Sequence, residues 1–265
     1  MNGDMDAFVA TLPEQTVVFV AILARIVALL VAFPALSSQS IPTVVRAAVA
    51  VSFTLLFFPI LSPLFSAAQT NDIMDPGRLI VFVCAEFLSG ALIGWLAQLM
   101  VLSFPVAVQM MSTFIGLSNV LQPDPELGAQ STPISHMAQL AVTVVIFTSG
   151  LYVLPLNAFV GSYHVFPPGH FPFLGDAAKA VARETGHSFL LAFQLAMPMI
   201  LIGTIWPMML GVLSRFSPGL QVYSLAMPAQ LLGGLLLLAL LLKAMLSVWM
   251  HATTNGFGSL PGVGF

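Results

Sequence analysis

The sequence contains few side chains of the types that carry out chemistry. No two of the five histidines have the spacing of metal ligands on one helix. Cys84 is the only cysteine, which excludes an intrachain disulfide and a CxxC site. The chain also lacks an HExxH motif and a glycine-rich phosphate loop. The sequence therefore predicts no catalytic residues, no metal and no cofactor, and the protein is expected not to be an enzyme.

Ionisable residues within apolar stretches are the exceptions. Arg25 and Glu86 each interrupt an apolar run, and a charge inside a membrane helix is costly unless it is paired or faces water. Each side chain could make a polar contact with a pore or another subunit, or could reach the membrane interface from near a helix end. Arg46 is grouped with them as a possible intramembrane polar contact.

The segment from Ser103 to Gln130 has an unusual composition. It has no charge before Asp124, yet amide, hydroxyl and methionine side chains alternate along it. Pro105 lies near the start of the segment, and Pro123 and Pro125 lie near its end. Proline disfavours a straight helix at both places. Such a segment is atypical of a membrane helix, and it predicts a polar-lined insert.

The chain as a whole has the composition of a membrane protein. Its 265 residues are 58% hydrophobic and 6% charged, with a mean hydropathy of +1.01. No Lys, Arg, Asp or Glu occurs in 87–123 or in 127–175, and both runs exceed the roughly 20 apolar residues that a spanning helix needs. The net charge of −3 includes no basic cluster, which argues against nucleic-acid binding.

The apolar runs predict an all-α membrane protein that forms one domain over residues 1–265. Helices are expected at about 14–33, 44–59, 79–102, 134–156, 188–213 and 223–250. A short amphipathic helix with Lys179, Arg183 and Glu184 is expected before the fifth of these. Prolines at 105, 155, 198, 207 and 228 predict broken helices. In lipid such breaks need neighbouring protein or a watery cavity, which indicates an assembly.

Two glycine pairs suggest close helix contacts. Gly90 and Gly94 form a GxxxG match, which allows two helix backbones to approach closely. Gly233 and Gly234 could also permit a close contact between two helices. Positive charges are too evenly divided between the expected loops to assign an orientation in the membrane.

Several motifs occur in an order that resembles the FliR family of flagellar export proteins, whose virulence counterparts are the SctT-type proteins of injectisomes. The motifs are Arg25–Leu30, Ile41–Arg46, Glu86–Gly94, Gly116–Ser118, Asp124–Gln130, Pro167–Gly169 and Gly211–Arg215. The resemblance covers most of the chain. Asn119 and the Thr132-Pro133 pair depart from the family pattern.

The resemblance implies a multi-pass subunit of the inner-membrane export gate of the flagellar basal body, a type III secretion system. Its fold would consist of helical hairpins that resemble a FliP and a FliQ unit joined in one chain. One such subunit would form a central channel with several copies of FliP and FliQ, contact FlhB and lie within a ring of FlhA. Unfolded flagellar subunits would pass through the channel.

The resemblance also implies that the segment at 103–130 is a re-entrant plug that closes the pore at rest. Met110, Met111, Phe114, Ile115 and Leu117 would form an adaptable apolar seal. Gly116 would let the backbone bend, and Gln109 would help to keep the lumen wettable. The loop after the plug would contribute Asp124, Pro125, Gly128 and Gln130. The alternative is that these side chains simply pack a helix against its neighbours.

Two other functions remain open at this stage. A small-solute secondary transporter or channel would also use broken helices at mid-membrane, although the sequence has no inverted repeat and few intramembrane charges to couple ions. A passive scaffold would tolerate changes in the plug without effect.

Overall fold

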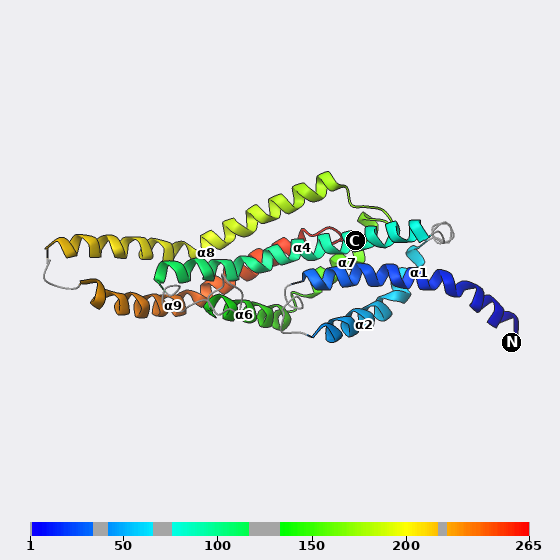
Figure 1. Ribbon diagram of the computed structural model, residues 1–265, viewed down its shortest axis with the longest axis horizontal. Helices are drawn as coiled ribbons and strands as arrows, with labels where there is room; N and C mark the ends of the chain where they lie inside the picture. The colour runs from blue at the N-terminus through cyan, green and yellow to red at the C-terminus, as the bar shows by residue number, and fades with distance from the viewer. Residues whose placement is uncertain (1, 34–41, 66–75, 117–132, 217–221, 265) are drawn as a thin grey trace. The chain divides into compact units, whose positions relative to one another are not determined.

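The computed structural model describes residues 2–33, 42–65, 76–116, 133–216 and 222–264 (Figure 1). Within these ranges the chain forms helices joined by turns, and no strand occurs. The helices are α1 (Asn2–Ala32), α2 (Thr43–Leu61), the 3-10 turn η1 (Ser62–Leu64), α4 (Pro76–Ile115), α6 (Pro133–Ser149), α7 (Val153–Val165), α8 (Leu174–Phe216) and α9 (Val222–Gly258). The prediction of an all-α protein is confirmed.

Five of these helices are long and apolar enough to cross a membrane. They are Glu14–Ala32, Thr43–Leu64, Pro76–Ile115, Leu174–Phe216 and Ala226–Gly258. Counting α6 and α7 together as one broken span gives a sixth. The chain is therefore a multi-pass membrane protein, and its spans correspond to the six apolar runs of the sequence.

The predicted end of the third helix at residue 102 was wrong. Helix α4 continues through Pro105 to Ile115, so the first half of the expected insert is helical. Its hydroxyl groups do not interrupt the helix, because Ser103 donates to the Met100 carbonyl and Ser112 to the Val108 carbonyl. The helix ends where Gly116 adopts a φ of +87°, a conformation that glycine accepts without strain.

The other helix boundaries differ for similar local reasons. The amphipathic segment with Lys179 and Arg183 is continuous with the fifth apolar run and forms the beginning of α8. The fourth run is interrupted at Gly150, whose φ is +76°, rather than at Pro155. Pro155 lies in the first turn of α7, where a missing backbone N–H leaves no hydrogen bond unmade.

The chain divides into two compact units, and the single domain over residues 1–265 stays a prediction. Unit 1 comprises Met1–Gln98, Gly150–Arg183 and Gly256–Phe265, and unit 2 comprises Leu99–Ser149 and Glu184–Asn255. Helices α4, α8 and α9 each contribute residues to both units.

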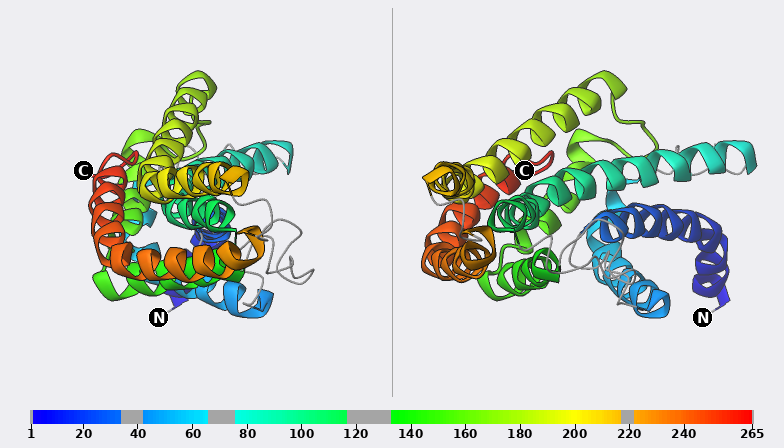
Figure 2. Two further views of the ribbon diagram at one scale, coloured as in Figure 1. Left: turned by 90° about the vertical axis from the view of Figure 1, so that its left-hand side faces the viewer. Right: turned by 60° about the vertical axis from the view of Figure 1, so that its left-hand side comes forward.

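Unit 1 is packed around aromatic side chains and close helix contacts. Helices α1 and α2 lie side by side (Figure 2), and the ring centroids of Phe19 and Phe58 are 6.1 Å apart. The α1–α4 contact uses the GxxxG pair: a Cβ on Gly90 would collide with the Arg25 carbonyl, and one on Gly94 would be 2.8 Å from the Leu29 carbonyl oxygen. The predicted close approach is therefore confirmed for this pair.

Unit 2 is packed around Phe104 of α4 and Trp249 of α9. Their ring centroids are 5.8 Å apart in an edge-to-face arrangement, and both side chains are buried. Such aromatic pairs prefer this geometry because the positive ring edge meets the negative ring face. Ser188 of α8 adds a hydrogen bond of 2.6 Å to the Leu99 carbonyl, so α4, α8 and α9 are tied together within this unit.

Candidate functional site

A buried ion pair lies within unit 1. Nε of Arg25, from α1, is 2.8 Å from Oε2 of Glu86, from α4, and both side chains are completely inaccessible to solvent. Burying one charge alone would carry a large desolvation penalty. The pair therefore requires further polar partners that satisfy the rest of each group.

The Arg25 guanidinium finds those partners on α7 and just beyond it. Nη1 donates to the Ser162 hydroxyl at 3.1 Å, and Nη2 donates to the Phe166 carbonyl at 3.2 Å. Cζ lies 3.8 Å from the ring centroid of Tyr163, within the range of a cation–π interaction. Both Nη atoms are thus hydrogen-bonded, and Nε faces the Glu86 carboxylate.

The Glu86 carboxylate is held from a second direction. The backbone N–H of Gly169 donates to Oε1 at 2.8 Å, and a hydrogen bond to a carboxylate is stronger than one between neutral groups. Gly169 has a φ of +77°, so a residue with a side chain would be strained there. We call Arg25, Glu86, Ser162, Tyr163 and Gly169 the buried polar cluster. It fastens α1 and α4 to α7 and to the turn that follows α7.

The sequence did not predict that Arg25 and Glu86 are each other's partners. The sequence suggested a contact with a pore or another subunit, or with the membrane interface. Either contact would leave the side chain accessible in the isolated chain. No spacing signal links two residues so far apart in sequence. Arg46 stands apart from the cluster, half-buried in the first turn of α2.

The predicted plug residues form the last two turns of α4 in unit 2. Met111 and Ile115 are 1% and 4% exposed, whereas Gln109, Met110 and Phe114 are half-buried. Gly116 follows the helix. Leu117 and the predicted loop residues Asp124, Pro125, Gly128 and Gln130 lie outside the residues that the structure describes.

Two glycines receive this end of α4. A Cβ on Gly203 of α8 would be 2.6 Å from the Phe114 carbonyl oxygen, and one on Gly234 of α9 would collide with the Ile115 side chain. Nε2 of Gln230 donates to the Phe114 carbonyl at 3.3 Å. We call Gly203, Gly234 and Gln230 the glycine seat. It allows the backbone of α8 to approach that of α4 closely and leaves room for the Ile115 side chain against α9.

A cavity of about 290 Å³ adjoins the glycine seat. Its lining includes Phe114 and Ile115 of α4, Trp206 of α8 and Leu237 of α9. The described contacts thus show the expected plug residues packing against neighbouring helices within this chain. The lining is mostly apolar and has few groups that could hydrogen-bond to a polar substrate.

The described part of the chain contains no group of three or more His, Cys, Asp or Glu side chains that could hold a metal ion. The Arg25 and Glu86 side chains are inaccessible to solvent and paired with each other, and Ser162 and Gly169 add hydrogen bonds to them. The buried polar cluster joins α1 and α4 to α7, and the glycine seat receives the end of α4.

The helices, their apolar spans and these two sites define a multi-pass, all-α membrane protein built for close helix packing. Residues 16–256 match the model of the family "bacterial export proteins, family 1", and the chain belongs to this family.

Curated relatives cover nearly the whole chain. The flagellar biosynthetic protein FliR of Caulobacter vibrioides is 29% identical over 92% of this chain and 95% of its own length. FliR of Escherichia coli is 23% identical over 91% of this chain and 90% of its own length. The Yop proteins translocation protein T of Yersinia pestis is 25% identical over 86% of this chain and 87% of its own length. The predicted resemblance to the FliR family is confirmed.

Proposed function

We propose that this chain is a non-enzymatic core subunit of the flagellar type III protein export gate. The match of residues 16–256 to the family of bacterial export proteins carries the proposal. Relatives that cover about nine tenths of the chain are named as flagellar biosynthetic proteins. A relative named as a translocation protein makes the injectisome counterpart the second candidate.

The proposed gate contains other membrane subunits. We infer that the chain forms a channel with FliP and FliQ homologues and contacts FlhB and FlhA homologues in the bacterial inner membrane. Two spans are weakly buried, which supports an assembly. Only 17% of the apolar stretch in the span Thr43–Leu64 and 11% of that in Ala226–Gly258 is buried within the chain. Prolines within α4, α8 and α9 support it too, since membrane helices tolerate them best where other protein surrounds them.

The end of α4 is the proposed closure of the channel. Met110, Met111 and Phe114 supply adaptable apolar surface, and Gly116 permits the sharp turn that a re-entrant segment needs. A side-chain hydrogen bond from Gln230 to the Phe114 carbonyl joins this end to α9.

The buried polar cluster takes a different part in this proposal. Because both charged groups in it are paired and inaccessible to solvent, it suits a rigid clamp that holds α1, α4 and α7 together. A small-solute transporter would instead need ionisable groups that alternate between exposed and buried states.

The test of the proposal is purification of the tagged chain from its own membranes in a mild detergent. Mass spectrometry should find FliP-like and FliQ-like subunits in stable proportion to the chain, and strains without the chain should fail to export flagellar subunits. A detergent-solubilised monomer, recovered without such partners from cells that export normally, would contradict the proposal.

A further inference from the structure

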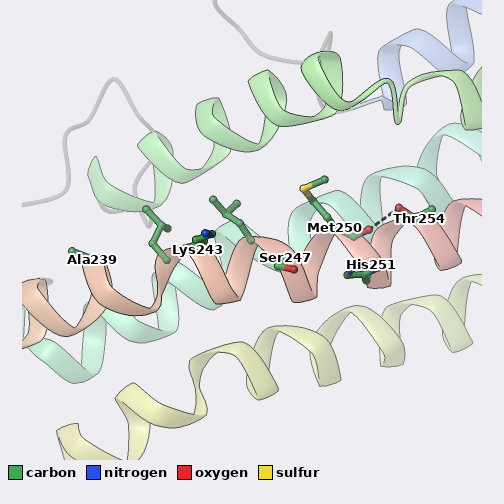
Figure 3. Close-up of a pocket in the computed structure, with 8 residues that line it drawn as sticks. Ala239, Lys243, Ser247, Met250, His251 and Thr254 are labelled. Atoms are coloured by element: carbon green, nitrogen blue, oxygen red, sulfur yellow. Dashed lines mark hydrogen bonds between the residues drawn. The ribbon is translucent and has the colours of Figure 1, made fainter.

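A compact turn follows helix α9. The last part of α9 is regular, and there the Thr254 hydroxyl donates to the Met250 carbonyl at 2.8 Å (Figure 3). After the helix, the Val263 N–H donates to the Leu260 carbonyl at 3.1 Å, and the Leu260 side chain is buried. We call residues 259–263 the α9 turn. It belongs to unit 1, as α7 does.

The α9 turn contacts α7 through two glycines. A Cβ on Gly161 of α7 would collide with the Gly262 carbonyl. A Cβ on Gly262 would collide with the Ala158 carbonyl and would lie 2.5 Å from the backbone nitrogen of Ser162. Gly262 also has a φ of +97°, a conformation that residues with a side chain rarely adopt. Both positions therefore require glycine while the turn lies against α7.

Ser162 lies between the α9 turn and the buried polar cluster. Its backbone nitrogen adjoins Gly262, whereas its hydroxyl accepts a hydrogen bond of 3.1 Å from Nη1 of Arg25. The next residue, Tyr163, places its ring centroid 3.8 Å from Cζ of Arg25. The part of α7 that the turn contacts thus supplies two of the contacts of the guanidinium, and a shift of this part would disturb both.

Packing joins the α9 turn to α7. The hydrogen bonds of the turn are local, since the N–H and the hydroxyl of Ser259 both donate to the Gly256 carbonyl, at 3.1 and 2.7 Å. In the ranges that the structure describes, no hydrogen bond joins the turn to α7. One methyl group on Gly161 would therefore part the two elements, although α7 alone would favour alanine over glycine.

We propose that the α9 turn is a latch that completes the buried polar cluster. The cluster holds Arg25 and Glu86 firmly only after the turn has closed on Gly161. The turn reaches α7 only when α9 has taken its place, so the latch makes the placement of α9 a condition for fastening α1 and α4. This device goes beyond the proposed function and does not depend on it.

Hydrogen exchange of backbone amides in the full chain, in detergent, tests the latch. The reporter is the Gly169 N–H, because it donates to the Glu86 carboxylate of the cluster. Gly161→Ala should raise its exchange rate by about tenfold or more, since the new methyl group displaces the α9 turn. Gly258→Ala is the matched control, because a Cβ there would meet nothing within 4 Å, and it should leave the rate unchanged.

A second substitution separates the latch from a direct effect on α7. Gly262→Ala should open the latch from the other side and raise exchange at Gly169 as well. In that background Gly161→Ala should raise the rate by less than about twofold more, because the carbonyl with which it collides has already moved away. Equal effects of Gly161→Ala in the two backgrounds, an unchanged rate in either single variant, or an equal rise at the amides of α2 would overturn the proposal.

Discussion

The Arg25–Glu86 pair makes a specific prediction at the scale of single residues. Arg25→Met should lower the free energy of unfolding in detergent by about 3–5 kcal/mol, because it leaves the Glu86 carboxylate buried without its counter-charge. The double variant Arg25→Met, Glu86→Gln should recover much of this loss, since it buries no charge. Denaturant titration followed by tryptophan fluorescence measures both. Equal destabilisation by the single and double variants would show that the charges are not coupled.

Gly90 makes a second prediction at this scale. Gly90→Ala should destabilise the protein by about 1–3 kcal/mol, because the new methyl group would collide with the Arg25 carbonyl on α1. Gly175 is the matched control, since it lies in a helix of the same unit and a Cβ there would meet no atom within 4 Å. Gly175→Ala should leave the unfolding midpoint unchanged or slightly raised. Similar midpoints for the two variants would contradict the α1–α4 contact.

Single residues also show what the sequence could and could not reveal. Composition identified Arg25 and Glu86 as unusual, because charged groups are rare in apolar runs. Their pairing depends on how α1, α4 and α7 meet, which no local pattern encodes. Ser162 and Gly169 gave no signal as members of a polar cluster, since serine and glycine are common in membrane helices and turns.

At the scale of helices, the sequence predicted the apolar runs well and their ends less well. Proline suggested breaks in α4, α8 and α9, yet these helices continue through Pro105, Pro198, Pro207 and Pro228. A proline removes one backbone donor, and packing along the rest of a long helix can outweigh that loss. The end of α4 is instead set by Gly116.

The glycine seat makes a prediction about the end of α4. Gly203→Ala should speed hydrogen exchange of the backbone amides at 111–115, because the methyl group would collide with Phe114 and push this end of α4 away from α8. Gly233→Ala is the control, since a Cβ at Gly233 would meet nothing within 4 Å although its neighbour Gly234 faces Ile115. It should leave exchange unchanged. Equal exchange in the two variants would contradict the seat.

At the scale of the whole molecule, each of the two units contains one of the two sites. The buried polar cluster fastens helices within unit 1, and the glycine seat holds the end of α4 within unit 2. The ordered motifs of the sequence led to the family, and the match over residues 16–256 established it. The partners could not be derived from residue patterns, because the exposed apolar sides of α2 and α9 resemble lipid-facing surfaces in composition.

The most direct measurement of the central claim removes the proposed closure. A strain that carries the chain without residues 110–116 should leak small ions across its inner membrane and should export flagellar subunits abnormally, because the apolar end of α4 no longer occludes the channel. The amount of the shortened chain in purified membranes, and its recovery with export subunits, provide the controls. Normal ion retention together with normal export, at normal amounts of assembled protein, would contradict the assignment of this segment as the plug.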